Sequence, residues 1–121
     1  MFIWQGLSMY EIGKIYQAPT VSFLVYESLH LAMLASQFAT KKSATTKWHS
    51  SETSALTAAT YWTYKLNSLV SCTKWYQPML LIDKKPYENE IFCFILTGEN
   101  LGWISYNVEG EVYFQTLQPK T

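Results

Sequence analysis

The chain has 121 residues, with nine lysines balanced by nine acidic residues and no arginine, so its formal net charge is zero. This balance disfavours nucleic-acid binding, because such binding needs several phosphates to be neutralised by basic side chains. Hydrophobic residues make up 49% of the chain, aromatic residues 17% and charged residues 15%. Such a composition excludes a disordered chain and favours a single domain with a substantial core.

The chain start and the two cysteines indicate where the protein resides. Residues 1–5 read MFIWQ and lack the cationic start and long apolar run of a secretory signal, so we expect a cytoplasmic protein. In a reducing compartment, Cys72 and Cys93 are expected to be inert packing residues. A disulfide or a redox switch stays open as the alternative, because their spacing alone does not exclude it.

Residues 1–78 favour helices. Ser8 and Glu11 form a capping box, which predicts a short helix over 8–17 that ends before Pro19. Residues 20–40 are apolar on nearly every helical face, which predicts a buried central helix. A membrane span is disfavoured there, because the segment contains Glu27, His30 and several other polar residues.

The third predicted helix covers 52–76, where apolar and aromatic residues recur at spacings of three and four. These residues are Ala59, Trp62, Leu66, Leu69, Thr73 and Tyr76. Glu52 near the start and Lys74 near the end complement the helix dipole, and Pro78 stops the helix.

After Pro78, short β-branched and aromatic runs alternate with turn residues, which predicts strands over 79–83, 91–96, 102–107 and 112–117. The run over 91–96 is apolar on both faces and is expected to be an interior strand. The predicted fold class is therefore α+β, with three N-terminal helices packed on a C-terminal four-stranded antiparallel meander. The alternative is a cone-shaped α+β fold, in which a curled sheet encloses an apolar cavity.

Charge is unevenly distributed along the chain. Residues 1–82 contain six lysines and three glutamates, whereas residues 83–121 contain three lysines and six acidic residues. This asymmetry favours head-to-tail contact between subunits or the choice of a charged protein partner. The alternative is that solvent-facing strand ends simply carry glutamates.

Motifs of enzyme chemistry are weak in this sequence. Glu27 and His30 lie three residues apart and could pair as a base and its orienting group, but a structural hydrogen bond is the simpler interpretation. Two such residues do not make a metal site, which needs further ligands. No glycine-rich phosphate loop and no nucleophile elbow occurs, so we expect no enzyme, no cofactor and no metal. A cysteine–histidine pair built on either thiol is the catalytic alternative.

Aromatic residues in polar surroundings favour a protein-interaction function, because tryptophan and tyrosine are enriched at interfaces. The predicted partner-binding residues are Trp48, Trp103, Tyr106, Lys41 and Lys42. We therefore expect a non-catalytic inhibitor, adaptor or assembly subunit that binds a protein partner, self-associates into a homo-oligomer, or both. The alternative is a small apolar ligand held between sheet and helices by Trp62, Tyr64, Phe92, Phe94 and Tyr106.

Overall fold

A computed structural model of the chain describes residues 10–39, 48–88, 90–107 and 115–116. Within these residues the order of elements is β1 (Ile15–Gln17), β2 (Ser22–Tyr26), α2 (Leu29–Ala39), β3 (Trp48–His49), α3 (Glu52–Leu66), β4 (Val70–Cys72), β5 (Met79–Tyr87), β6 (Glu90–Thr97), β7 (Asn100–Asn107) and β8 (Gln115–Thr116). The prediction of three helices on a four-stranded meander is therefore wrong. Two helices accompany a larger antiparallel sheet, and more of the described residues lie in strands than in helices.

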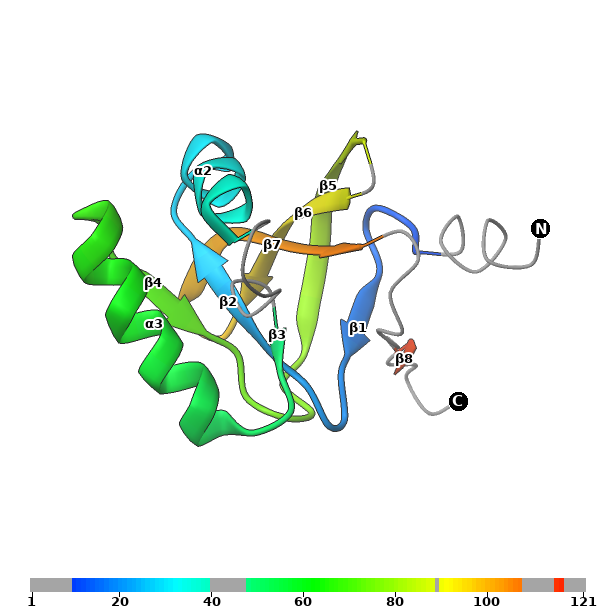
Figure 1. Cartoon of the computed structure of the whole chain (residues 1–121). Helices are drawn as coiled ribbons and strands as arrows, with labels where there is room; N and C mark the ends of the chain where they lie inside the picture. Colours follow the sequence, from blue (N-terminus) through cyan, green and yellow to red (C-terminus); the bar gives the residue numbers. More distant parts are fainter. Residues whose placement is uncertain (1–9, 40–47, 89, 108–114, 117–121) are drawn as a thin grey trace.

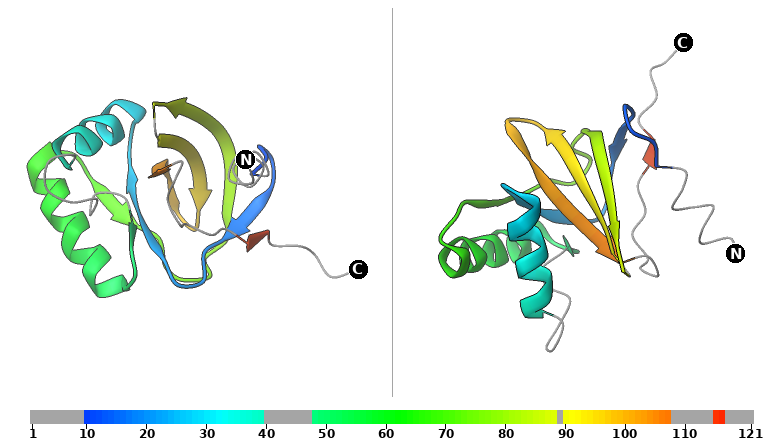
Figure 2. Two further views of the ribbon diagram at one scale, coloured as in Figure 1. Left: turned by 45° about the vertical axis from the view of Figure 1, so that its right-hand side comes forward. Right: turned by 90° about the horizontal axis from the view of Figure 1, so that it is seen from above.

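The sheet has the strand order β3-β2-β7-β6-β5-β1-β8, with β4 as a branch that pairs with β2. Every recorded strand pairing is antiparallel. The predicted four-stranded meander is wrong, because only β5, β6 and β7 pair in sequence order, each longer than predicted, whereas β8 pairs with β1. The sheet is strongly curled, with both helices on one side and β1 and β8 on the other (Figures 1 and 2).

Two hydrophobic cores lie on the two faces of this sheet. The sheet core fills the concave side and includes Tyr16, Phe23, Val25, Met79, Leu81, Cys93, Ile95, Ile104 and Tyr106. The helix core lies between the sheet and the helices and includes Leu24, Tyr26, Ala32, Ala35, Ala55, Ala59, Trp62, Val70 and Phe92. Alanines at the helix contacts let both helices approach the sheet closely, so that Trp62 and Phe92 fill the space between them.

The predicted central helix over 20–40 is wrong, because its first part is strand β2. All five residues of β2 are buried, since alternate side chains face the sheet core and the helix core. A continuous apolar run does not distinguish a buried helix from a strand that is covered on both faces. The helix α2 begins only at Leu29, where the Ser28 hydroxyl accepts a hydrogen bond from the Leu31 N–H.

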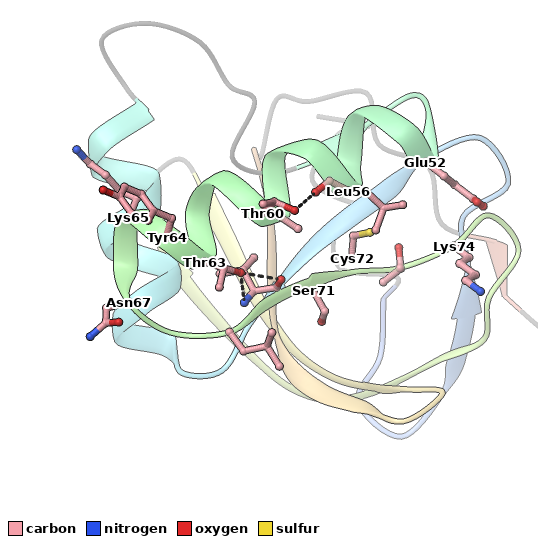
Figure 3. Close-up of a pocket in the computed structure, with 14 residues that line it drawn as sticks. Glu52, Leu56, Thr60, Thr63, Tyr64, Lys65, Asn67, Ser71, Cys72 and Lys74 are labelled. Atoms are coloured by element: carbon pink, nitrogen blue, oxygen red, sulfur yellow. Dashed lines mark hydrogen bonds between the residues drawn. The ribbon is translucent and has the colours of Figure 1, made fainter.

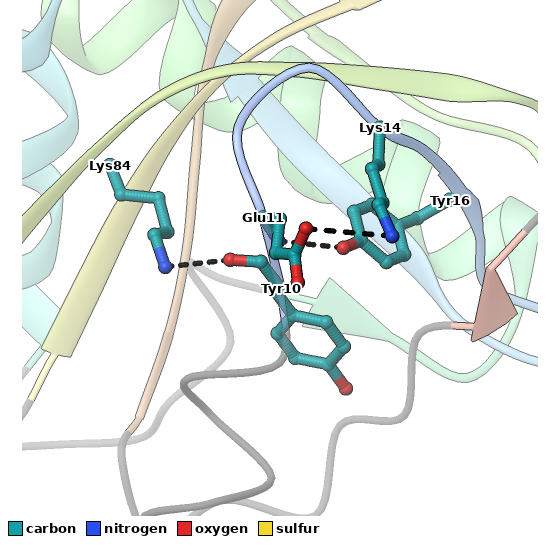
Figure 4. Close-up of polar contacts among 5 residues, drawn as sticks. All are labelled: Tyr10, Glu11, Lys14, Tyr16 and Lys84. Carbon is teal, nitrogen blue, oxygen red and sulfur yellow. Dashed lines mark hydrogen bonds and ion pairs between the residues drawn. The ribbon is translucent and has the colours of Figure 1, made fainter.

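The predicted first helix over 8–17 is also wrong for the part that the structure describes. Residues 10–14 form a turn that leads into β1, and Gly13 has a φ of 94°, which a helix excludes. The turn is fastened to β5 by hydrogen bonds from Gly13 N–H to the Leu81 carbonyl (2.7 Å) and from Leu81 N–H to the Lys14 carbonyl (2.9 Å). The Lys84 ammonium also donates to the Tyr10 carbonyl at 2.6 Å (Figure 4).

The third helix begins where predicted but ends ahead of the predicted limit. Ser51 is the N-cap, and its side chain accepts from the Ser54 N–H. Asn67 ends the helix in the left-handed conformation, with φ 53° and ψ 43°. The chain then turns back and forms β4 beside the helix, so Leu69 and Thr73 do not belong to a helical seam. Of the predicted fourth strand, the described part is β8, and residues 112–114 and 117 lie outside the described residues.

Strands β2 and β7 meet at Tyr26 and Trp103, and Gly102 makes this meeting possible. A Cβ atom on Gly102 would lie 2.4 Å from the Tyr26 carbonyl oxygen and 2.7 Å from Cγ1 of Val25. Both of these atoms belong to buried residues, so there is no free space into which they could shift.

We predict that Gly102→Ala lowers the free energy of unfolding by about 3 kcal/mol, because backbone and core must separate to accept a methyl group. Urea denaturation followed by tryptophan fluorescence measures the loss. Leu101→Ala is the control in the same strand, since Leu101 is 54% exposed and its truncation should cost less than about 1 kcal/mol. Equal losses in the two variants would contradict the close approach at Gly102.

The buried Cys93 thiol in the sheet core predicts that the protein loses stability at alkaline pH. Burial raises the pKa of the Cys93 thiol to about 12, so the neutral thiol is favoured in the folded protein. The stability from this group is complete below the unfolded thiol pKa of 9.0 and is lost as the pH rises from 9.0 toward 12. We expect Cys93→Ala to show a shallower fall in unfolding free energy between pH 9 and pH 10, measured by urea titration. Parallel slopes for both proteins would contradict this assignment.

Candidate functional site

A concave surface of the described residues is a groove along the junction of α3 and β4, with a volume of about 1120 Å³. We call it the α3–β4 groove. It is lined by Leu56, Ala59, Thr60, Thr63 and Tyr64 of α3 and by Leu69, Val70, Ser71, Cys72 and Thr73 on the returning chain, with Glu52, Lys65, Asn67 and Lys74 at its borders (Figure 3). The groove exists because Asn67 reverses the chain and sets β4 alongside the helix.

Hydrogen bonds hold the helix to the returning chain at both ends of the groove. At one end the Thr63 hydroxyl donates to the Val70 carbonyl (3.2 Å) and accepts from the Val70 N–H (2.9 Å). At the other end a carboxylate oxygen of Glu52 accepts from the Trp75 N–H at 3.0 Å. The groove is therefore a preformed feature whose width is set by these two contacts.

The floor of the groove contains part of the outer edge of β4. Just after β4, Thr73 N–H donates to the Phe23 carbonyl, and Phe23 N–H donates in return to the Thr73 hydroxyl. Because hydrogen-bonded and non-hydrogen-bonded pairs alternate, the backbone groups of Val70 and Cys72 point away from β2. The Thr63 hydroxyl binds both backbone groups of Val70.

The walls of the groove are apolar and well exposed. Leu56 is 60% exposed, Leu69 is 62% exposed and Tyr64 is 86% exposed. The Cys72 side chain points from β4 toward α3, and burial, followed by the nearby Glu52 carboxylate, raises the pKa of its thiol, whereas Lys74 opposes this rise (Figure 3). Both cysteines are free, and a neutral thiol at Cys72 adds to the apolar character of the groove.

The outward face of α3 carries almost no charge. Between Glu52 and Lys65 its exposed side chains are Thr53, Ser54, Leu56, Thr57, Thr60, Tyr61 and Tyr64. We call Leu56, Thr57, Thr60, Tyr61 and Tyr64 the α3 face. The neighbouring helix α2 contains no Asp, Glu, Lys or Arg at all. A helix that faces water usually has a charged outer side, so this layer is unusual for a surface that stays solvated.

The predicted partner-binding residues do not gather on one surface. Trp48 is half-buried on β3 and packs against the sheet core, and Tyr106 is buried within that core. Trp103 is half-buried beside the helix core, on the other face of the sheet, with its ring 5.0 Å from that of Phe94. Lys41 and Lys42 lie outside the described residues. Their assignment as a set stays a prediction, and Tyr106 has no exposed surface to offer.

The residues predicted to line a ligand pocket are also separated. Trp62 and Phe92 belong to the helix core, Tyr106 belongs to the sheet core, and Tyr64 is exposed. The cavity inside the curled sheet measures only about 20 Å³, which is the space of one water molecule. The strand β3 between the helices fits the cone-shaped alternative, but the interior of the curl is filled by side chains.

The candidate catalytic pair Glu27 and His30 lies at the surface and outside the groove. Glu27 and His30 are exposed, and the Glu27 carboxylate accepts a hydrogen bond from the Ser68 hydroxyl. A contact of 2.8 Å between His49 Nδ1 and the Ser54 hydroxyl has no local signal in the sequence. This contact ties β3 to the first turn of α3 and does not line the groove. Within the described residues no group of three or more His, Cys, Asp or Glu side chains is placed to hold a metal ion.

The surroundings of Cys72 in the groove and of Cys93 in the sheet core predict different rates of alkylation. At pH 8 we expect iodoacetamide to alkylate Cys72 in the folded protein, whereas Cys93 is 3% exposed and reacts only after unfolding. Glu52→Gln should speed alkylation of Cys72 because a negative charge is lost, and Lys74→Gln should slow it because a positive charge is lost. Mass spectrometry of tryptic peptides measures both rates. The same change of rate in both variants would contradict this electrostatic account.

Comparison with known proteins adds no relative from which a function could be inferred. No protein-family model matches the chain, and neither a curated protein nor a solved structure matches it. Among the helices of the described residues, none has the length and apolar character needed to cross a membrane. The functional assignment therefore depends on the α3–β4 groove and the α3 face.

Proposed function

We propose that this chain is a non-catalytic protein-interaction module whose binding surface is the α3 face together with the α3–β4 groove. The observation that carries the proposal is a helix face that is exposed, contains Leu56, Tyr61 and Tyr64, and is free of charge between Glu52 and Lys65. The centres of protein interfaces are depleted of charged residues and enriched in aromatic ones. A partner protein or a second copy of the chain would cover such a surface.

The threonines of the α3 face favour its burial by a protein. The Thr57 hydroxyl donates to the Thr53 carbonyl at 3.1 Å, and the Thr60 hydroxyl donates to the Leu56 carbonyl at 3.0 Å. Because both hydroxyl donors are already used within the helix, a partner can cover these side chains without leaving the donors unpaired. The two threonines then present their methyl groups outward, beside the exposed Leu56 and Tyr61.

Buried contacts hold the exposed rings next to this face in place. Phe38 stacks on the buried Trp62 with ring centroids 6.1 Å apart, and Tyr61 meets the same ring edge-on at 5.1 Å. The Lys65 ammonium lies 5.6 Å from the centroid of the Phe38 ring. Rings that are ordered before binding lose less conformational entropy when a partner covers them. These contacts make Phe38 and Tyr61 suitable anchors at the rim of the surface.

Site-specific photo-crosslinking in cells tests the proposal. With benzoylphenylalanine in place of Tyr64, we expect ultraviolet light to give a covalent adduct of discrete mass, because a bound protein lies against this position. A partner chain gives an adduct of its own mass added to that of this chain, whereas self-association gives the dimer mass.

The control places the same group at Tyr87, which is 47% exposed on β5 and belongs neither to the α3 face nor to the α3–β4 groove. The proposal expects no discrete adduct there. It fails if Tyr64 gives none, or if both positions give the same pattern of adducts, since the surface would then not be selective.

A further inference from the structure

The most outward residues of α3 form a stripe that is symmetric about the middle of the helix. The stripe lies opposite the buried side of the helix and consists of Thr53, Thr57, Thr60 and Tyr64. Residues at alternating spacings of four and three share one side of a helix, where they can pack against a second helix. The spacings in this stripe read the same in both directions along the chain. Two copies of α3 can therefore pack antiparallel about a two-fold axis with every residue of the stripe in register.

The sizes of the side chains suit this antiparallel pairing. Tyr64 of each copy would lie beside Thr53 of the partner subunit, so that a large ring meets a small residue at both ends. Thr57 would lie beside Thr60 of the partner subunit, and small residues in the middle let the two helices approach closely. The hydroxyls of Thr57 and Thr60 already donate to carbonyls of their own helix, so their contact buries no unpaired donor.

The residues beside the stripe add apolar contacts on both of its sides. Leu56 borders the stripe on the side of the α3–β4 groove, and Tyr61 borders it on the side of Phe38 and α2. Under the two-fold symmetry each of these residues would meet the same residue of the partner subunit. Leucine and tyrosine tolerate such self-contact because neither side chain is charged at neutral pH.

The charges of α3 do not oppose this pairing. An interface between identical chains brings equal surfaces together, so a charged face would repel itself, whereas α3 is uncharged between Glu52 and Lys65. The antiparallel order keeps the two Glu52 residues about 20 Å apart along the helices, and likewise the two Lys65 residues. No ion pair between the copies is needed. Lys65 therefore keeps its contact with the Phe38 ring, and Glu52 keeps its hydrogen bond from the Trp75 N–H.

The exposed apolar area reaches what a specific dimer needs. If a fully exposed side chain of this size presents about 200 Å², the exposed parts of Leu56, Tyr61, Tyr64 and the neighbouring Phe38 offer roughly 500 Å² in each copy. Two copies would bury about 1,000 Å² in total, which is the lower limit for a specific interface. Because the area is at this limit, we expect a dissociation constant in the micromolar range.

Resting on the proposed function, we propose that the protein that covers the α3 face is a second copy of this chain, bound through antiparallel α3 helices in a two-fold symmetric dimer. A partner with a different sequence would bury the same apolar side chains, but it would not require a stripe that is symmetric about its own middle. The inference thus names the partner at the surface proposed above.

Sedimentation velocity of the full chain between about 1 and 200 µM tests the inference, and we expect a shift from monomer to dimer over this range. Thr60→Glu should weaken self-association by at least about tenfold, because it places a carboxylate at the centre of the interface in each copy. Glutamate is a good helix former at an exposed position, so the variant should fold, as circular dichroism would verify.

Ile12→Glu is the matched control for Thr60→Glu. Ile12 is 55% exposed in the turn before β1, on the other side of the sheet from the helices, and the substitution makes the same change in net charge (Figure 1). Self-association should be unchanged in this variant. A chain that stays monomeric over the whole range would overturn the inference, and so would equal effects of the two substitutions.

Disulfide trapping tests the antiparallel register. In a Cys72→Ser background, Thr53→Cys protein is mixed with Tyr64→Cys protein and oxidised with copper phenanthroline. We expect disulfide-linked dimers that contain one chain of each variant, because the two positions are neighbours only across an antiparallel pair of helices. Mass spectrometry distinguishes these dimers from dimers of a single variant. A preference for dimers of a single variant, or no linked dimer at all, would overturn the register.

The photo-crosslink at Tyr64 separates this inference from the proposed function. A dimer-mass adduct that is joined to the peptide containing Thr53 of the partner subunit supports both. An adduct with a different protein, together with a monomeric chain in sedimentation, would overturn the dimer and leave the proposed function standing.

Discussion

The burial of β2 on both faces is the constraint on which the remaining structure depends. Its side chains alternate between the sheet core and the helix core, and its backbone pairs with β3, β4 and β7. The only glycine in the described part of β7 lies where this strand crosses β2, and a larger residue there would push the two strands apart. Because β4 pairs with β2, the position of the groove floor relative to α3 also follows from this burial.

The sequence predicts most of the strands after Pro78, but it predicts few of the helix and strand boundaries before Pro78. The strands β5, β6 and β7 have local signals, since short apolar runs alternate with turn residues. The start of α3 is similarly local, at Ser51 and Glu52. The strand β2 was missed because its continuous apolar run fits a buried helix equally well, and only the tertiary packing on both faces decides between them. The end of α3 was missed because the spacing of apolar residues continues past Asn67 into β4.

The sequence predicts protein interaction as the kind of function, but it does not predict which surface carries it. Aromatic residues in polar sequence surroundings suggested Trp48 and Tyr106, yet the fold packs both against the sheet core. Tyr64 lies in a helix for which the sequence predicts one apolar seam. Its ring is the more exposed one, because Ala55, Ala59 and Trp62 form the buried side of α3. The lack of charged residues between Glu52 and Lys65 is the sequence feature that points to this surface. This uncharged outer side is what supports the proposal that a protein covers α3.

The chain beside the groove also limits unwanted association through the β4 edge. A free strand edge is a general template for pairing with other chains, and proteins commonly shorten or block such edges. Here Thr63 and Gln77 occupy the backbone groups on both sides of Cys72, so that a continuous ladder cannot extend along β4. A protein that covers the groove would therefore gain affinity from the apolar walls rather than from the backbone.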